Sequence, residues 1–266
     1  MNINMNIEEK EIIARTSDSP EVLAELAKDQ HVFVRRNVAR NPNTSPETLS
    51  FLAKDQDYRV RGEVAENPHT SAEILSDLAK DPDYRVRAIV AKNPHTSPDA
   101  LAELAKDEVF YVRYLVARHS RTFSETLSEL AKDEAKDPFC CVRMEVAHNL
   151  HTPNELLAEL AKDPHEDVRC IIANNPHTSA ELLSELAKDQ KVDVRRNVAG
   201  NLSTSPETLS ELAKDEDRWV RFFVADNLST SPETLENLGT DEFENVRKKA
   251  EQNLSRKQAE DAEMSM

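Results

Sequence analysis

The feature that most constrains this chain is a segment that returns every 26 residues. The run NPNTSPETLSFLAKDQDYRVRGEVAE occupies residues 41–66, and an earlier copy extends back to Arg15. Later copies start at Asn67, Asn93, His119, Asn149, Asn175, Asn201 and Asn227. A unit this small cannot bury its own apolar face, so it gains a core only by stacking on its neighbours. The nine copies over residues 15–252 therefore predict a solenoid.

The first part of each copy predicts a short helix. Thr44 followed three residues later by Glu47 is a capping-box pattern, so we expect Thr44 as the N-cap. Leu49 and Leu52 then lie on one helix face, spaced i and i+3. We expect this helix to end near Lys54.

The second part of each copy predicts another helix, and hence an all-α fold. We expect it to begin at Asp55, because equivalent aspartates elsewhere precede proline, as an N-cap does. Val60 and Val64 face inward on a helical wheel. The helix should stop at Asn67, because a residue before proline resists the α conformation.

An arginine and an aspartate recur with the apolar framework. The arginine, Arg61 in the second copy, falls inside the buried arc of its helix, and a buried guanidinium needs a partner. The recurring aspartate, Asp55 and its equivalents, can supply one. We interpret the two rows as a ladder that links repeats, rather than as an arginine row for phosphates. The recurring asparagine, Asn67 and its equivalents, is interpreted as turn and cap chemistry.

The run N-P-x-T-S-P-E-x-L-x-x-L-A-K-D-x-x-x-x-V-R-x-x-V-A resembles the leucine-rich repeat variant family. The resemblance covers residues 15–252 and implies a right-handed α-solenoid, bacterial in type and related to HEAT repeats. Because that family alternates α and 3₁₀ helices, it also implies that one helix of each repeat can be 3₁₀. The family includes an iron–sulfur protein with an N-terminal cysteine-rich segment. The first cysteine here is Cys140, so no cofactor is expected.

The ends and one insertion depart from the repeat. Residues 1–14 resemble a half repeat, with Lys10 on the arginine position, and are expected to cap the array. Four extra residues in the fifth copy, near Asp137, are expected to lengthen its first helix. Residues 253–266 are expected to be a cap remnant followed by a frayed polar tail.

Differences among the copies concentrate on the outer arc of the second helix. These positions are the equivalents of Tyr58, Arg59, Gly62, Glu63 and Glu66, and the wheel places them away from the core. Six basic against two acidic side chains give +4 there in the first four copies, and four against six give −2 in the last five.

Rings and arginines gather on this arc, as they do in protein interfaces. The alternative is that single rings pack between layers. The candidate partner-binding residues are Arg36, Arg40, Tyr58, Arg59, Tyr84, Arg85, Phe110, Tyr111, Tyr114, Arg118, Trp219, Phe222 and Phe223.

The sequence contains no pattern typical of catalysis or of a metal centre. The repeated histidines His69, His95, His151 and His177 are expected in loops about 10 Å apart, too far to share an ion. A second group matches no zinc spacing, and no catalytic or metal residue is expected from it. Its members are Cys140, Cys141, Cys170, His119, His148 and His151.

Composition narrows the function. A net charge of −16 opposes general attraction to nucleic acid or anionic membrane. No secretion leader or run of about 20 apolar residues is evident, and three cysteines favour a reducing cytoplasm. We expect a non-enzymatic scaffold that binds a protein or peptide of acidic character. The alternative is a nucleic-acid-binding HEAT-like protein, and the oligomeric state is left open.

Overall fold

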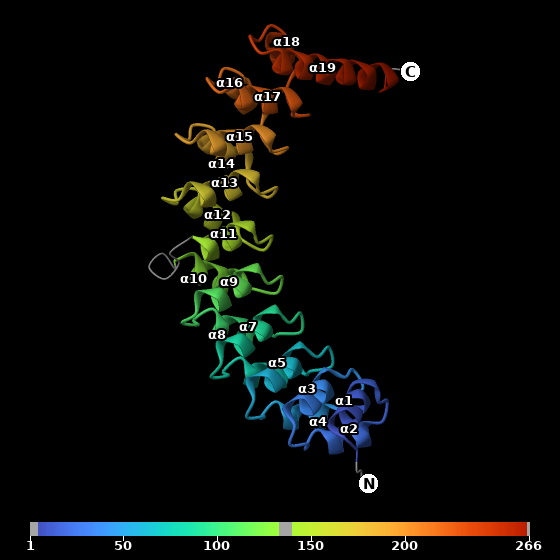
Figure 1. Ribbon diagram of the computed structural model, residues 1–266. Coiled ribbons are helices and arrows are strands. Elements are labelled where there is room, and N and C mark those ends of the chain that lie inside the picture. The colour runs from blue at the N-terminus through green and yellow to red at the C-terminus, as the bar shows by residue number, and fades with distance from the viewer. Residues whose placement is uncertain (1–4, 133–139, 265–266) are drawn as a thin grey trace. The chain divides into compact units, whose positions relative to one another are not determined.

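The computed structural model describes residues 5–132 and 140–264 (Figure 1). Over these residues the secondary structure is helical, with no β-strand. The chain forms two compact units, residues 1–130 and 131–266, and each is described by itself. Pairs of helices repeat along both units, so the fold is the expected α-solenoid.

The helices alternate between a short and a longer member, and the longer one is the second helix of each repeat. The first ten are α1 (Ile7–Thr16), α2 (Pro20–Leu26), α3 (Val32–Arg40), α4 (Pro46–Leu52), α5 (Tyr58–Glu66), α6 (Ala72–Leu78), α7 (Tyr84–Lys92), α8 (Pro98–Leu104), α9 (Phe110–Arg118) and α10 (Ser124–Ala131). The others are α11 (Cys141–His148), α12 (Asn154–Leu160), α13 (Glu166–Asn174), α14 (Ala180–Leu186), α15 (Val192–Gly200), α16 (Pro206–Leu212), α17 (Arg218–Asp226), α18 (Pro232–Leu238) and α19 (Glu244–Met264).

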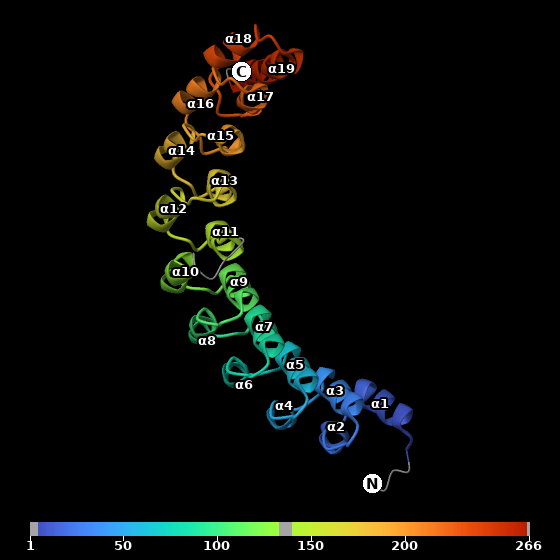
Figure 2. The same ribbon diagram turned by 60° about the vertical axis from the view of Figure 1, so that its left-hand side comes forward.

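Each unit has two rows of helices. Within a unit the odd-numbered helices pack on one another, and the even-numbered helices other than α10 pack on their odd-numbered neighbours (Figure 2). The core lies between the rows, where Leu49 and Leu52 of α4 meet the layer that holds Val60 and Val64 of α5, all fully buried. Burial of each such side chain contributes about 1.5–3 kcal/mol, so the apolar framework predicted from the sequence is the core.

The arginine–aspartate ladder is confirmed, and each rung joins two repeats. Arg61 donates from Nε to Asp81 Oδ2 at 2.6 Å and from Nη2 to Oδ1 at 2.8 Å. Its Nη1 bonds the carbonyl oxygen of Asp55 at 2.7 Å. Lys10 makes the corresponding ion pair with Asp29. The other described rungs are Arg35–Asp55, Arg87–Asp107, Arg143–Asp163, Arg169–Asp189, Arg195–Asp215 and Arg221–Asp241.

The recurring asparagine also joins repeats, which goes beyond its expected turn role. Asn67 Nδ2 donates to the carbonyl oxygens of Ala39 at 2.7 Å and Asn41 at 3.1 Å, which lie on either side of the junction between the two preceding copies. Its Oδ1 accepts the backbone N–H of His69 at 2.9 Å. One buried amide thus satisfies backbone groups on both sides of a layer boundary, which a turn residue alone would not do.

His119 stands where the other copies have asparagine, and it reproduces the same bonds. The backbone N–H of Arg121 donates to Nδ1 at 3.0 Å, so the ring proton of the neutral imidazole is on Nε2. Nε2 lies 3.1 Å from the Asn93 carbonyl oxygen and donates to it. Burial lowers the pKa of His119, outweighing the opposite effect of the Asn93 bond.

Two expected helix starts are wrong. The first helix is capped by Ser45, whose hydroxyl accepts the N–H of Thr48, while the buried Thr44 hydroxyl donates to the Val38 carbonyl oxygen at 2.6 Å. In the same way α5 begins at Tyr58 with Asp57 as its cap. The equivalents of Asp55 lie in the loop before it, where the carboxylate accepts the inter-repeat arginine instead of capping a helix.

The remaining expectations concern helix type and the ends. Both helices of a repeat are α-helical, and 3₁₀-type bonds are confined to the helix ends and the loops, as from the N–H of Asp55 to the Leu52 carbonyl oxygen and from the N–H of Val60 to the Asp57 carbonyl oxygen. From Ser255 onward the chain continues α19 to Met264, where a frayed tail was expected. The expected longer helix of the fifth copy lies outside the described residues, since α10 ends at Ala131 and the insertion falls within 133–139.

One rung can be broken with little change of shape. In Asp81→Asn, the amide oxygen still accepts the N–H of Asp83, but Arg61 loses its charged partner. Because removing one member of a buried ion pair leaves the other uncompensated, we expect a loss of about 3 kcal/mol in unfolding free energy, measured with urea. Glu25→Gln, which breaks the exposed pair with Lys28, is the control and should cost below about 1 kcal/mol. Equal losses would contradict the ladder's role.

His119 should make stability depend on pH. Its pKa in the folded chain is lower than the ordinary 6.5 of the unfolded chain, so the unfolded state binds the proton more readily. The stabilisation is complete above pH 6.5 and is lost as pH falls towards the folded-state pKa. His119→Asn restores the asparagine that the other copies have at this position. We expect this variant to lose the His119-dependent fall in melting temperature as the pH is lowered below 6.5. An unchanged pH profile would contradict the assignment.

Candidate binding face

Fewer positions on the odd-numbered helices are exposed to solvent than the helical wheel predicts. Gly62 and Glu63 are buried rather than outward-facing. A Cβ on Gly62 would lie 3.0 Å from Ile89 Cδ1 of α7, and Glu63 is enclosed by Arg36 and Arg40 of α3. A helical wheel treats the helix as isolated. In the row of odd-numbered helices, however, the neighbouring helices cover both sides of α5. In this copy the exposed variable positions are therefore Arg59 and Glu66, with a partly exposed edge at Tyr58.

The first unit presents four well-exposed rings on this side. Phe33, Tyr84, Phe110 and Tyr111 each expose more than two-fifths of their surface. Tyr111 and Tyr114 are stacked, with ring centroids 6.1 Å apart and planes 11° from parallel. Tyr58 is instead engaged within the protein: the Arg85 guanidinium carbon lies 3.6 Å from its ring centroid, and Arg85 Nη1 donates to its hydroxyl at 2.8 Å.

Most arginines of the first unit's face already have acidic partners. Arg36 and Arg40 both contact Glu63 at 2.6 Å. Arg59 contacts Asp57 at 2.7 Å, and this bond lowers the pKa of Asp57 to about 2.

Arg85 contacts Asp83 at 2.6 Å in the same manner. With Asp57 and Asp83 counted, six basic side chains stand against four acidic ones, so the +4 expected from the sequence falls to +2. Arg118 is exposed and has no ion pair among the described residues, so it is the arginine of the predicted set best able to receive an acidic group.

The second unit gathers its three predicted rings on α17. Trp219 and Phe223 are exposed by 40% and 37%, and Phe222 is half-buried between them. The Trp219 and Phe222 rings meet edge-on at 5.8 Å, as do those of Phe222 and Phe223. Edge-to-face contacts hold the rings in place, so this cluster is a pre-formed apolar surface.

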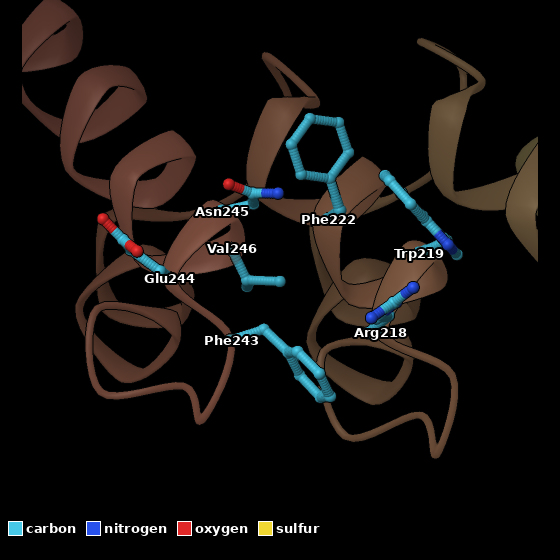
Figure 3. A pocket seen from close by; sticks show the side chains of 7 residues that line it. All are labelled: Arg218, Trp219, Phe222, Phe243, Glu244, Asn245 and Val246. Atoms are coloured by element: carbon cyan, nitrogen blue, oxygen red, sulfur yellow. The ribbon is translucent and has the colours of Figure 1, made fainter.

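A pocket of about 250 Å³ opens beside this cluster (Figure 3). Trp219 and Phe222 of α17 form one wall, and Phe243 and Val246 come from the following segment. The Arg218 guanidinium carbon lies 5.3 Å from the ring centroids of both Trp219 and Phe243. Glu244 and Asn245 complete the lining. The pocket thus joins apolar walls to an exposed cation, and Arg218 has no ion pair among the residues described.

A second hollow, of about 320 Å³, lies on the other flank of α17. It is lined by Phe223 and Leu202, both exposed, and by Asn197 and Gly200 of α15. Arg196 also lines it but is bound to Asp217 at 3.0 Å. The rings of α17 therefore stand between two concave regions.

Sequence reasoning missed Arg218 and Phe243 as site residues. In the sequence, Arg218 is one of the four basic side chains on the variable arc of the last five copies, and nothing else distinguishes it. Phe243 occupies the position of Asp57 in the second copy and Asp217 in the eighth, so an aromatic residue at a capping position was the available signal.

The predicted cysteine–histidine group is not assembled. Over the described chain, Cys141, Cys170, His119, His148 and His151 belong to no set of three that could hold an ion. The repeated loop histidines are exposed, as expected, and their backbone N–H groups bond the preceding asparagine. Burial raises the pKa of Cys170. Cys140 meets two residues outside the predicted group, His165 and Asp167.

None of the described helices is both long and apolar enough to cross a membrane. Helical repeats, continuous core rows and a variable outer side define a repeat-helical scaffold. The family model for the leucine rich repeat variant matches residues 32–57, 58–83 and 84–109. A solved structure described as a leucine-rich repeat variant with a novel repetitive structural motif is 30% identical over 77% of this chain and 80% of that one, with a TM-score of 0.62. The chain belongs to the leucine-rich repeat variant family.

Two further solved structures match this chain at lower similarity. An engineered protein is 16% identical over 93% of both chains, with a TM-score of 0.37. An archaeal HEAT-like repeats protein from Thermococcus onnurineus is 14% identical over 96% of this chain and 97% of that one, with a TM-score of 0.26. Comparison with curated proteins gives no significant match.

Proposed function

We propose that this protein is a non-enzymatic scaffold that binds a protein or peptide through the outer side of its odd-numbered helices. The observation that carries the proposal is the α17 cluster, where exposed Trp219 and Phe223 border concave regions while the repeat framework is fully buried. Tryptophan, tyrosine and arginine in such surroundings dominate binding energy in protein interfaces.

The charges favour a partner segment that carries an apolar group beside a carboxylate. The apolar group would enter the pocket against Trp219 and Phe243, and the carboxylate would meet Arg218 at its rim. A nucleic acid is less favoured, because phosphate binding needs several free cations in a row. Along the first unit, Arg36, Arg59 and Arg85 are already bound to carboxylates.

The test is capture of partners from lysate of the native host by wild type and by Trp219→Ala/Phe223→Ala, quantified by mass spectrometry, followed by titration with the captured protein. Interface anchors of this kind lose about 2 kcal/mol or more on truncation, which is roughly a thirtyfold loss of affinity. We expect this loss for the double variant.

The matched control is Phe51→Ala/Phe123→Ala. These two rings are more exposed than Trp219 and Phe223, but Phe51 lies in α4 and Phe123 directly precedes α10, so both are outside the odd-numbered helices. The control should bind as wild type does. If the control lost affinity and the α17 variant did not, the interface would lie on the row of even-numbered helices, and the proposal would be contradicted. Capture abolished by nuclease would instead favour nucleic acid and contradict the proposal.

A further inference from the structure

One mixed group of metal-ligating side chains lies within the second unit. Cys140, His165 and Asp167 each offer one ligand atom, and these atoms all lie within 4.8 Å of one another. Cys140 is 2% exposed and precedes α11, whereas His165 caps α13 and Asp167 lies in its first turn. The group therefore spans two adjacent repeats, and its sulfur is the buried member.

The repeat register, rather than chance on an exposed surface, brings these residues together. Cys140 occupies the position of Tyr58, and His165 and Asp167 occupy those of Asp83 and Arg85 one repeat later. The same three positions are in contact in the first unit, where Arg85 bonds both Tyr58 and Asp83.

Another copy repeats the contact within the second unit. Glu166 and Lys191, at the first two of these positions, form an ion pair at 2.6 Å. Neighbouring repeats thus juxtapose these side chains as a rule. Of these three examples, only the one that contains Cys140 brings a thiol, an imidazole and a carboxylate together.

The geometry suits a small tetrahedral cation. His165 Nδ1 lies 3.4 Å from Asp167 Oδ2. Two ligands about 2.0 Å from a tetrahedral zinc ion are about 3.3 Å apart. Nδ1 accepts the backbone N–H of Asp167 at 3.4 Å, so this nitrogen is the unprotonated one, and a metal ion bound to it would replace that long hydrogen bond.

The donor set distinguishes among metals. One thiolate with one imidazole and one carboxylate is typical of zinc and unlike the all-oxygen sites of calcium and magnesium. A buried thiol also separates this group from the exposed acidic clusters that are common on protein surfaces.

We propose that Cys140, His165 and Asp167 bind Zn²⁺, with water as the fourth ligand. On binding, the Cys140 S–H bond breaks, the sulfur donates its electron pair to the metal, and the proton goes to solvent. Neither the metal nor the sulfur changes oxidation state. The ion ties the start of α11 to the start of α13 and so fastens two adjacent repeats, next to the one insertion in the array. Affinity should fall as pH falls, because protons compete for the thiolate and the imidazole.

The experiment is a titration of the full chain with Co²⁺ under reducing conditions, followed by competition with Zn²⁺. Bound Co²⁺ should give a thiolate-to-metal charge-transfer band and the visible bands of a tetrahedral site, and Zn²⁺ should abolish both. Cys140→Ser should remove the charge-transfer band, whereas Cys141→Ser and Cys170→Ser should retain it. His165→Ala and Asp167→Asn should each weaken Co²⁺ binding at least about tenfold, since loss of even an outer-shell partner has that effect.

Other results would overturn the assignment. A charge-transfer band that persists in Cys140→Ser, or that is lost only in Cys141→Ser or Cys170→Ser, would place the metal on another sulfur. Absence of the band in wild type would exclude the site. The equivalent position accepts Tyr58 and Glu166, so Cys140→Ser should fold, and its far-UV circular dichroism should match wild type. His165→Ala and Asp167→Asn provide an independent reading that leaves the thiol intact.

Discussion

The structure depends on polar groups that each repeat buries and only its neighbour can satisfy. Arg61 reaches forward to Asp81, and Asn67 reaches back to the carbonyl oxygens of Ala39 and Asn41. A buried amide without such partners would cost roughly 2–7 kcal/mol, at least as much as one buried core side chain contributes, and an unpaired guanidinium would cost more. The polar ladders therefore couple the repeats, and they also fix the register between them, because a shifted repeat would leave both groups unpaired.

The register between repeats also determines which surface positions can change without disturbing the packing. In the second copy, Gly62 and Glu63 lie between neighbouring odd-numbered helices, so a change at either position must suit a partner across the row, as Glu63 suits Arg36. The equivalents of Arg59 and Glu66 face outward and carry no such constraint. A scaffold of this kind can acquire binding groups at those positions, such as Trp219, without disturbing the core.

Much of the fold could be predicted, because positions that keep the same residue type in most of the nine copies are those that the fold requires. The Leu49 and Val60 positions, the arginine–aspartate ladder and the α-solenoid followed from recurrence and helical spacing. The helix starts were less predictable, since Thr44 and Ser45 are both good caps and only packing shows which hydroxyl is buried. The sequence shows His119 only as a member of the cysteine–histidine group, whereas the structure shows that it replaces the recurring asparagine and makes the same bonds to the backbone.

The sequence by itself determined the repeat, its two helices and the residues that fill the core, because periodicity and apolar spacing are local properties. It also placed the rings of α17 on the variable side. Only the tertiary structure decided that Arg59 and Arg85 are bound to aspartates, that Phe243 and Arg218 complete a pocket, and that Cys140 meets His165 and Asp167. Those contacts depend on how far a side chain reaches and how closely adjacent helices pack, and neither can be read from position on a wheel.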